Sequence, residues 1–362
     1  MKKWKAIRKV YVRAPNWLGD VIMATPAFAR IRAHWIDAEI VCGIKKGHLG
    51  IMSGSKSFDS YLELPSARGW KGLWAEAKLL RQGGFDLAFL FPNSPRTALA
   101  ALLGGVPHRV GYMQGRRLLM TNGLVARPPK RKDKKRWGPR REPHPMIDYW
   151  FGLCDLFEMP RVGPKPILRL SGEEEERGAA RLWEAGLDPT RPFAALNPGA
   201  AFGPTKLWPN SHWARLAELL SERFPRMQLL LTPGPGEEEM SEHIRRASGT
   251  AIHVIRDPVL SLPELKAVLA RAALMVTTDS GPRHIAVAFD TPHLVLMGPT
   301  HPGYTNRNLD KAYILRHDLP CGPCHLKTCP LGHECMTELL PEEAAAAAKR
   351  LLGGMIPDLP RS

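Results

Sequence analysis

One short segment, Thr277-Thr278-Asp279-Ser280-Gly281-Pro282-Arg283-His284, combines residue types that suit phosphate binding. It joins a predicted strand, 274–278, to a predicted helix start. A glycine such as Gly281 lets the backbone approach a ligand closely, and Pro282 suits a first helical position, where no N–H is required. Free N–H groups and the helix dipole at such a start attract phosphate. An ordinary helix cap has the same residues, so the segment alone leaves both interpretations open.

Lys206 offers a positive charge at the same predicted edge of the sheet. It lies in Pro204-Thr205-Lys206-Leu207-Trp208-Pro209, which joins a predicted strand, 193–197, to a predicted helix, 210–224. Loops that follow parallel strands meet at one edge of the sheet, so Lys206 would lie beside the phosphate-binding segment as a point charge. The alternative is an ordinary solvated lysine.

A carboxylate, Asp20, follows the turn Pro15-Asn16-Trp17-Leu18-Gly19 after the first predicted strand, 8–14. It could act as a general base or cap the helix that we expect to begin there. A helix N-terminus stabilises a carboxylate and lowers its pKa, which weakens it as a base. A weak base still suffices where the transition state resembles an oxocarbenium ion and the acceptor proton leaves late.

Four of the six cysteines cluster near the end of the chain, as Cys321, Cys324, Cys329 and Cys335. Their spacing, C-x2-C-x4-C-x5-C, contains one zinc half-site, but the second pair departs from the usual C-x2-C spacing. Packing of the thiols in a compact loop is the favoured interpretation, with zinc binding as the alternative.

Several common catalytic motifs are missing from the sequence. It contains no G-x-x-x-x-G-K-[ST], G-x-G-x-x-G, G-x-S-x-G or H-E-x-x-H pattern. It also lacks Asp-x-Asp, the carboxylate pair with which many sugar transferases bind a metal–diphosphate. This absence disfavours a metal-bridged donor, and we expect neither a metal nor another cofactor.

Predicted strands and helices alternate along the chain, which favours parallel sheets covered by helices. A helix opens at Asp20, and Pro26 within it predicts a kink or a later start. The remaining predicted strands are 39–42, 85–91, 227–232 and 293–297, and the remaining predicted helices are 146–156 and 341–352.

The length of 362 residues suggests two domains. The segment Gly163–Ser171, with Pro164 and Pro166, has the composition of a linker. We therefore expect an N-terminal domain at 1–165, a C-terminal domain at 172–338 and a cleft between these two α/β halves. The remainder, 339–362, is predicted to be a helix and tail that pack back on the N-terminal domain.

The net charge of +16 predicts an anionic partner, which could be a nucleic acid, a membrane surface or a phosphorylated substrate. Nine basic residues and one acidic residue lie within 127–141, a polar, proline-containing segment that we expect to form an exposed loop. Lys130 and Arg131 in this loop are candidates for contact with such an anionic partner. A loop that only improves solubility is the alternative.

The ends and the hydropathy of the chain predict its location. The basic start Met1–Lys5 is not followed by the apolar segment of a signal peptide. No apolar run of 18 residues could span a bilayer. We therefore expect a cytoplasmic protein, either free or peripheral on the inner face of the inner membrane.

Five motifs together resemble the lipopolysaccharide heptosyltransferases of glycosyltransferase family nine. Their order and spacing agree over nearly the whole chain, and the cysteine cluster is most similar to the heptosyltransferase II branch, which adds the second heptose. Members that add the first heptose, or that use another nucleotide-sugar or acceptor, stay open as alternatives. The motifs are Asn16-Trp17-Leu18-Gly19-Asp20, Asn197-Pro198-Gly199-Ala200, Lys206-Leu207-Trp208-Pro209, Asp279-Ser280-Gly281-Pro282-Arg283-His284 and Gly298-Pro299-Thr300.

The resemblance implies an α/β GT-B fold of two Rossmann-like domains whose parallel sheets face each other across a cleft. It implies an inverting, metal-independent transfer of L-glycero-D-manno-heptose from ADP-heptose to the inner core of lipopolysaccharide, with an acceptor of the Kdo2-lipid A-heptose type. Asp20 would deprotonate the acceptor hydroxyl, and Asn16 would lie with the acceptor. Lys130 and Arg131 of the basic loop would contact this anionic acceptor or the membrane that carries it. The donor would be held by Lys206, Asp279, Ser280, Gly281, Pro282 and His284 at the diphosphate, by Glu237 at the ribose and by Leu260 at the adenine.

The sequence departs from the family at two places. Pro282 replaces the leucine or other apolar residue that is frequent there, and it removes a possible N–H contact. The loop 127–141 also contains more basic residues than we expect for the family. The register of the ribose contact is also open, because three glutamates follow one another at 237–239.

Two other classes of protein were weighed against a transferase. A nucleic-acid-binding protein would explain the charge, but apart from Trp137 no aromatic residue is interleaved with the basic loop, and no nucleic-acid module is present. We expect no nucleic-acid partner. The other class is a zinc-stabilised scaffold without activity.

Overall fold

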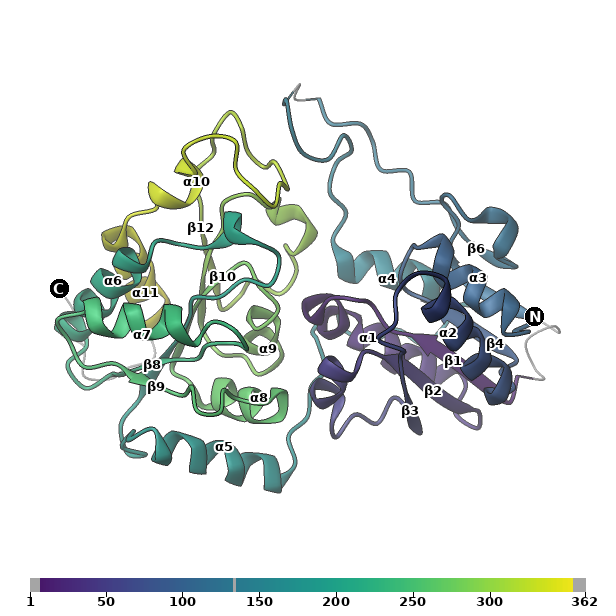
Figure 1. Ribbon diagram of the computed structural model, residues 1–362, viewed down its shortest axis with the longest axis horizontal. Coiled ribbons are helices and arrows are strands. Elements are labelled where there is room, and N and C mark those ends of the chain that lie inside the picture. The colour runs from purple at the N-terminus through teal and green to yellow at the C-terminus, as the bar shows by residue number, and fades with distance from the viewer. Residues whose placement is uncertain (1–6, 133–134, 354–362) are drawn as a thin grey trace. The chain divides into compact units, whose positions relative to one another are not determined.

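The computed structural model describes residues 7–132 and 135–353 (Figure 1). The basic start Met1–Lys5 and Lys134 of the basic loop lie outside these residues. The chain forms two compact units: the first contains 1–129 and 144–169, and the second contains 130–143 and 170–362. The division falls between Arg169 and Leu170, inside the segment with linker composition.

The first unit contains a six-stranded parallel sheet with the strand order β3-β2-β1-β4-β5-β6. The order reverses between β1 and β4, and doubly wound folds bind their ligands at such a point, beyond the carboxyl ends of the strands. The strands are β1 (Lys9–Arg13), β2 (Glu39–Ile44), β3 (Ser60–Glu63), β4 (Leu87–Leu90), β5 (His108–Tyr112) and β6 (Asn122–Leu124).

The helices of the first unit form two packed pairs, α1 with α4 and α2 with α3. The predicted helix at 146–156 is confirmed as α4. The helices are α1 (Leu18–His34), α2 (Gly69–Gly83), α3 (Pro95–Leu103) and α4 (Met146–Asp155), with short 3-10 turns at Lys46–Met52 and Arg117–Leu119.

Helix α1 continues through Pro26, so the expectation of a later start is wrong. Proline has no N–H to donate to the carbonyl four residues earlier, which is that of Ile22. The hydroxyl of Thr25 donates to this carbonyl instead, at 2.7 Å. Thr25 Oγ1 also accepts from the N–H of Ile167 at 2.7 Å, which fastens the end of the first unit to the helix.

The second unit repeats the architecture, with a parallel sheet in the order β12-β11-β10-β7-β8-β9 and a reversal between β7 and β10. The predicted strands 193–197 and 274–278 are confirmed without change as β7 and β10. The strands are β7 (Phe193–Asn197), β8 (Gln228–Leu231), β9 (His253–Val254), β10 (Leu274–Thr278), β11 (His293–Leu296) and β12 (Ala312–Leu315).

Two groups of helices cover this second sheet, α5 with α8 and α9, and α6 with α7 and α11. Where α5 crosses α8, a Cβ atom at Gly178 would lie 2.4 Å from Cβ of Ala267, so the close approach requires glycine. The helices are α5 (Gly172–Glu184), α6 (Asn210–Arg223), α7 (Glu238–Ala247), α8 (Leu262–Arg271), α9 (Arg283–Ala288), α10 (Glu334–Thr337) and α11 (Pro341–Leu352), with short 3-10 turns at Pro204–Lys206 and Pro302–Tyr304.

The final helix, α11, has the bounds predicted from the sequence but a different packing partner. We expected it to pack back on the N-terminal domain. Instead it packs against α6, β11 and β12 and belongs to the second unit. Its alanine face, with Ala344 and Ala348 fully buried, allows this close contact with the sheet. Among the described helices, none is long and apolar enough to cross a membrane.

Candidate active site

Three loops meet at the carboxyl edge of the second sheet, where the strand order reverses. Asn197, at the end of β7, donates from its side chain to the carbonyl of Thr232 after β8, at 2.7 Å. The hydroxyl of Thr278, at the end of β10, donates to the carbonyl of Gly199 at 2.7 Å. Ser280 Oγ lies 3.4 Å from Asn197 Oδ1. These bonds hold the segments 197–200 and 277–284 together, as their predicted position at one sheet edge requires.

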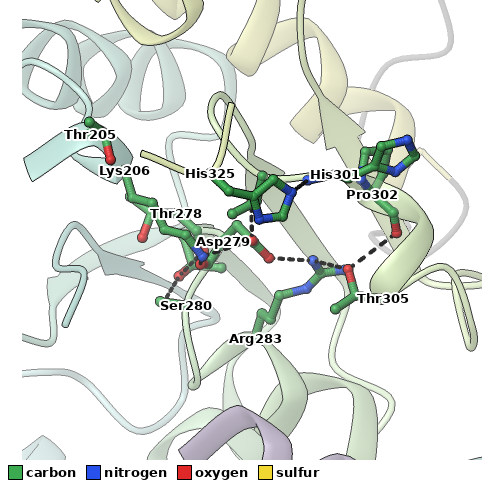
Figure 2. Close-up of polar contacts among 12 residues, drawn as sticks. Thr205, Lys206, Thr278, Asp279, Ser280, Arg283, His301, Pro302, Thr305 and His325 are labelled. Atoms are coloured by element: carbon green, nitrogen blue, oxygen red, sulfur yellow. Dashed lines mark hydrogen bonds and ion pairs between the residues drawn. The ribbon is translucent and has the colours of Figure 1, made fainter. Parts of the chain in front are cut away.

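Asp279 lies at the centre of the candidate site (Figure 2). Its Oδ2 is 2.9 Å from Lys206 Nζ, and its Oδ1 accepts from Arg283 Nη1 at 2.8 Å. The hydroxyl of Thr300, after β11, donates to Oδ2 at 2.6 Å. Arg283 also donates to Thr305 Oγ1 at 3.1 Å. The structure therefore brings Lys206 to the turn after β10, as predicted, and pairs its charge with a carboxylate.

The pairing determines the charge of Asp279. Burial alone would raise the pKa of this carboxyl group, but the positive charges of Lys206 and Arg283 and the hydrogen bond from Thr300 outweigh burial and hold the pKa well below its ordinary value. Since the folded-state pKa is below the unfolded one, the carboxylate contributes stability above the unfolded pKa. That contribution is lost as the pH falls through the folded pKa.

Trp208 fixes the position of Lys206. Its side chain is 1% exposed, packs edge-on against Trp213 with ring centroids 5.2 Å apart, and donates from Nε1 to the carbonyl of Leu339 at 2.9 Å. The ring of Phe202 lies 5.1 Å from Lys206 Nζ. The buried Trp208 therefore anchors the loop that carries Lys206. Lys206 is not the freely solvated lysine that the sequence left as the alternative.

Two histidines near Asp279 are uncharged at neutral pH. Burial, Arg283 and other nearby groups lower the pKa of His284 well below its usual value. Burial, Lys206 and His301 lower the pKa of His325 to about 4. The N–H of His301 donates to His325 Nε2 at 3.1 Å, so this nitrogen is an acceptor (Figure 2).

Sequence reasoning did not assign Arg283, Thr300, Thr305 or His325 to the site. Arg283 lies four residues after Asp279, the spacing at which opposite charges pair on a helix, and Thr300 follows the strand β11. These two signals could have identified both residues. Nothing in the sequence places His325 beside them, because it reaches the site from a long irregular loop.

The turn after β10 differs in detail from the expected phosphate cradle. Pro282 is the N-cap of α9, and the helix begins at Arg283 and has six residues. The N–H of His284 donates to the carbonyl of Gly281 at 3.1 Å, and that of Ile285 donates to the carbonyl of Pro282 at 2.9 Å. Two N–H groups that were expected to be free are therefore bonded within the turn.

Glu237 is the glutamate that faces the site. Its carboxylate accepts from the N–H of Gly234 at 2.8 Å, and a Cβ atom at Gly199 would lie 1.8 Å from its Oε2. Burial raises the pKa of Glu237, and hydrogen bonds from the backbone of Gly234 and Ala200 partly oppose this rise. Glu239, by contrast, has a side chain that is 90% exposed. The contacts of Glu237 distinguish it within the run of three glutamates.

Leu260 is 8% exposed and lies in the loop between β9 and α8, directly before the Ser261 that caps α8. It lies in the same unit as the Asp279 cluster. Its burial agrees with an apolar role, but the contacts of the described residues do not join it to Lys206 or Asp279.

In the first unit, Asp20 and Asn16 follow β1 at the point where that sheet reverses its strand order. Helix α1 begins at Leu18 after Trp17 as N-cap, so Asp20 is the third helical residue and the cap interpretation is wrong. Asp20 is partly exposed. The side chain of Asn16 accepts from Arg13 at 3.0 Å, and its carbonyl accepts from Lys45 Nζ at 2.8 Å. The structure therefore fixes the backbone and side chain of Asn16.

A buried network beneath this turn restrains Arg13. Arg13 is 5% exposed, and its Nε is 3.1 Å from Glu76 Oε1, while Arg96 Nη1 is 2.8 Å from Oε2 of the same glutamate. One buried carboxylate thus pairs with both arginines, which offsets part of the cost of burying Arg13. Through Arg13, Asn16 is therefore connected to this ion-pair network.

The sequence placed the whole basic loop, 127–141, in the N-terminal domain, but only residues 127–129 of it belong to the first unit. Residues 130–143 belong to the second unit. Lys130 forms an antiparallel bridge with Arg141, and Lys135 Nζ donates to the carbonyl of Leu319 at 3.2 Å. Backbone carbonyls of the second unit therefore hold the loop. The amino-acid composition of the loop does not predict these contacts.

The four clustered cysteines are all free. Cys335 is buried, and burial raises the pKa of its thiol to about 12. A Cβ atom at Gly298 would lie 2.8 Å from Cys335 Sγ, so this thiol packs tightly beyond the end of β11. Within residues 7–132 and 135–353, no group of three or more His, Cys, Asp or Glu side chains could hold a metal ion.

Comparison with known proteins identifies the family. Residues 73–334 match the family described as glycosyltransferase family 9 (heptosyltransferase). Lipopolysaccharide heptosyltransferase 2 of Escherichia coli K12 is 28% identical over 316 residues, which cover 85% of this chain and 88% of the relative.

Solved structures agree in fold. The structure of E. coli ADP-heptose LPS heptosyltransferase II has a TM-score of 0.75 and 24% identity and covers 96% of this chain and 99% of its own. E. coli heptosyltransferase WaaC, solved with ADP, has a TM-score of 0.67 and 15% identity over 95% of this chain and 99% of its own. The fold is GT-B, with two Rossmann-like units. The chain belongs to glycosyltransferase family 9, the heptosyltransferases.

Proposed function

We propose that this heptosyltransferase moves L-glycero-D-manno-heptose from ADP-heptose to a lipopolysaccharide inner core that already carries one heptose. The observation that carries the proposal is the cluster of Lys206, Asp279 and Arg283 at the strand-order reversal of the second sheet. Doubly wound folds bind nucleotides at this position. The name heptosyltransferase 2 of the E. coli relative supports the second heptose, and the ADP in WaaC supports an adenine nucleotide.

The second unit would bind the donor. Lys206 would contact the diphosphate, with Asp279 restraining the ammonium group through their 2.9 Å contact. Ser280 would present a hydroxyl to the diphosphate, and Gly281 and Pro282, in the turn before α9, would lie beside it. His284, held uncharged by burial and Arg283, would add a hydrogen bond without adding a charge.

The nucleoside would lie beside the loops after β8 and β9. A carboxylate with two acceptor oxygens suits the two hydroxyl groups of a ribose, and Glu237 is held at this edge by Gly234. Leu260, in the loop before α8, would contact the adenine ring. This arrangement depends on Gly199, because any side chain at that position would occupy the space of the Glu237 carboxylate.

Gly199→Ala should weaken ADP binding by roughly tenfold to a hundredfold, the value of one or two hydrogen bonds to a charged group. The added Cβ would displace the end of a flexible side chain, so the melting temperature should change little. Gly172→Ala is the control, because a Cβ at Gly172 would meet no atom within 4 Å. Calorimetric titration with ADP measures the effect. Unchanged affinity would show that Glu237 does not bind the ribose.

The first unit would bind the acceptor. Asp20 would take the proton of the acceptor hydroxyl as that oxygen attacks the anomeric carbon from the face opposite the diphosphate. The glycosidic bond forms as the bond to the ADP oxygen breaks, so ADP leaves with the electron pair and the configuration inverts. Asn16, fixed by Arg13 and Lys45, would orient the acceptor beside this base.

The acceptor is a glycolipid, so we further propose that the enzyme works peripherally on the inner face of the inner membrane. Basic residues near an anionic surface contribute about 1 kcal/mol each, screened beyond a Debye length. The net charge of +16 favours this location.

A donor panel tests the proposed substrate. The purified protein is incubated with acceptor and, in turn, ADP-heptose, ADP-glucose, GDP-mannose or UDP-glucose, with and without EDTA, and the released nucleotide is measured. We expect acceptor-dependent release of ADP from ADP-heptose, unchanged by EDTA, since Lys206 and α9 replace a metal at the diphosphate. Preference for another donor would overturn the proposed substrate, and loss of activity in EDTA that magnesium restores would show a metal-bridged diphosphate.

A further inference from the structure

Arg283 is the most deeply buried charged side chain of the Asp279 cluster (Figure 2). Its side chain is 1% exposed, against 12% for Lys206 and 11% for Asp279. Both of its hydrogen bonds come from Nη1, to Asp279 Oδ1 at 2.8 Å and to Thr305 Oγ1 at 3.1 Å. A side chain this deeply buried contacts the carboxylate and not a ligand in solution.

The cluster contains more positive than negative charge. In the part of the chain that the structure describes, Asp279 is the one carboxylate within ion-pair distance of either Lys206 or Arg283. Lys206 and Arg283 contribute two positive charges and Asp279 one negative charge, so the three side chains carry one net positive charge. Burying a charge is costly unless it is paired, and here one carboxylate compensates only one of two cations.

The neighbouring histidines do not alter this balance at neutral pH. Burial, together with Arg283 and other nearby groups, lowers the pKa of His284 well below its usual value. Burial also lowers the pKa of His293 to about 4 and that of His325 to about 4. The hydroxyl of Thr300 donates to Asp279 without adding a charge. The net charge of the cluster is therefore determined by Lys206, Asp279 and Arg283.

The contacts of Lys206 show why the second cation matters. Lys206 Nζ donates to the carbonyl oxygen of Asp279 and to its Oδ2, at 2.9 Å for the latter. An ammonium group has three N–H donors, so one remains for a ligand oxygen. Without Arg283, however, Lys206 and Asp279 would form a neutral pair, and the carboxylate would repel an approaching diphosphate as strongly as the ammonium group attracts it.

We propose that Arg283 is a positioning residue of the donor site, which compensates the Asp279 carboxylate so that the site keeps a net attraction for a diphosphate. The diphosphate as ligand rests on the proposed function. Arg283 acts through Asp279 from the buried side of the cluster, while Lys206 presents the charge to the ligand. The affinity of the site for an anion should therefore follow the net charge of the three side chains.

Removal of one positive charge tests the proposal. Arg283→Met should weaken ADP binding at least about tenfold, because one uncompensated charge acts on the diphosphate through a medium of low effective dielectric constant. Affinity for adenosine, which has no phosphate charge, should not change. Arg271→Met is the control: Arg271 is the exposed last residue of α8, and its loss should change ADP affinity less than about twofold. Equal losses in the two variants, measured by calorimetric titration, would overturn the proposal.

A second substitution distinguishes charge from structure. Asp279→Asn combined with Arg283→Met removes one charge of each sign, so the cluster again carries one net positive charge. This double variant should bind ADP within about threefold of the unaltered protein, and therefore more tightly than Arg283→Met alone. A purely structural role of Arg283 predicts a further loss, because the double variant lacks more contacts. Failure of the double variant to recover affinity would contradict the proposal.

The test does not depend on the stability of the single variant. Arg283→Met leaves a buried carboxylate with one cation fewer, so thermal unfolding is measured alongside binding. If this variant does not fold, the same charge is removed in the Asp279→Asn background, where no buried carboxylate is left unpaired. The double variant should then bind ADP about tenfold more weakly than Asp279→Asn alone. Equal affinities of these two variants would refute the role of Arg283.

Titration with inorganic pyrophosphate separates this proposal from the proposed transfer reaction. Pyrophosphate presents a diphosphate without nucleoside or sugar, so the same order of affinities is expected even if the protein uses another nucleotide-sugar or transfers no heptose. If the unaltered protein binds ADP or pyrophosphate and the variants do not differ, the role of Arg283 is wrong while the donor site stands. If it binds neither, both are wrong.

Discussion

Asp20→Ala should lower kcat by about 10²- to 10⁴-fold, the usual contribution of a general base. Asp20 lies in the first turn of α1, whereas the N-cap is Trp17. The substitution therefore leaves the N-cap itself unchanged, so a large loss of activity would report on chemistry. Binding of ADP-heptose, which we assign to the second unit, should stay within a few-fold. Single-turnover transfer and calorimetric titration of donor measure the two quantities.

Two further variants separate a base from a structural carboxylate. Asp20→Asn keeps the shape and a hydrogen-bonding side chain but cannot take a proton, so it should be nearly as inactive as the alanine variant. Asp37→Ala, at an exposed position beyond the end of α1, is the matched control and should retain full activity. Asp20 is not the base if its alanine variant keeps more than about a tenth of the original kcat.

Lys206→Ala should lower kcat by about 10²- to 10³-fold, which corresponds to roughly 2.7–4 kcal/mol of stabilisation of developing charge. Negative charge accumulates on the diphosphate as the glycosidic bond breaks, and Lys206 is the restrained ammonium group beside the turn after β10. Its removal would also leave the Asp279 carboxylate with one fewer cation, so repulsion of the diphosphate would add to the loss. The affinity for ADP should therefore fall together with kcat.

The comparison between nucleotides makes this second test specific. ADP should lose more affinity than AMP, because AMP lacks the phosphate group that would contact Lys206. Lys327→Ala is the control. The ammonium group of Lys327 lies 6.0 Å from the centroid of the Phe202 ring that Lys206 also approaches, but Lys327 is exposed. Equal losses for ADP and AMP would indicate a disturbed loop instead of a lost phosphate contact.

Local sequence patterns predicted the elements that carry the site better than the contacts within it. The apolar runs of β7 and β10 are buried on both faces, so composition alone gave their bounds. The position of Lys206 and Asp279 followed from the rule that loops after parallel strands share an edge. By contrast, the tolerance of α1 for Pro26 depends on one hydroxyl, that of Thr25, and no propensity describes such a local replacement.

Segments held by irregular contacts could not be placed from the sequence. The sequence predicts the basic loop in the first unit from its position in the chain, whereas Lys135 donates to carbonyls of the second unit and the backbone of Gly138 lies against Pro323. His325 reaches the site from the loop that carries the cysteines, with no periodicity to signal it. Long-range contacts between backbone carbonyls and loop side chains leave no repeating trace in a sequence, so they emerge only from the fold.

Analysis of the transfer product tests the central claim most directly. The purified protein is incubated with ADP-heptose and either an inner-core acceptor that carries one heptose or one that carries none, and the products are analysed by mass spectrometry and NMR. We predict that one heptose is added to the heptose-bearing acceptor, with inverted anomeric configuration, and that the other acceptor reacts poorly. Preferential transfer to the acceptor without heptose, or retention of configuration, would contradict the assignment.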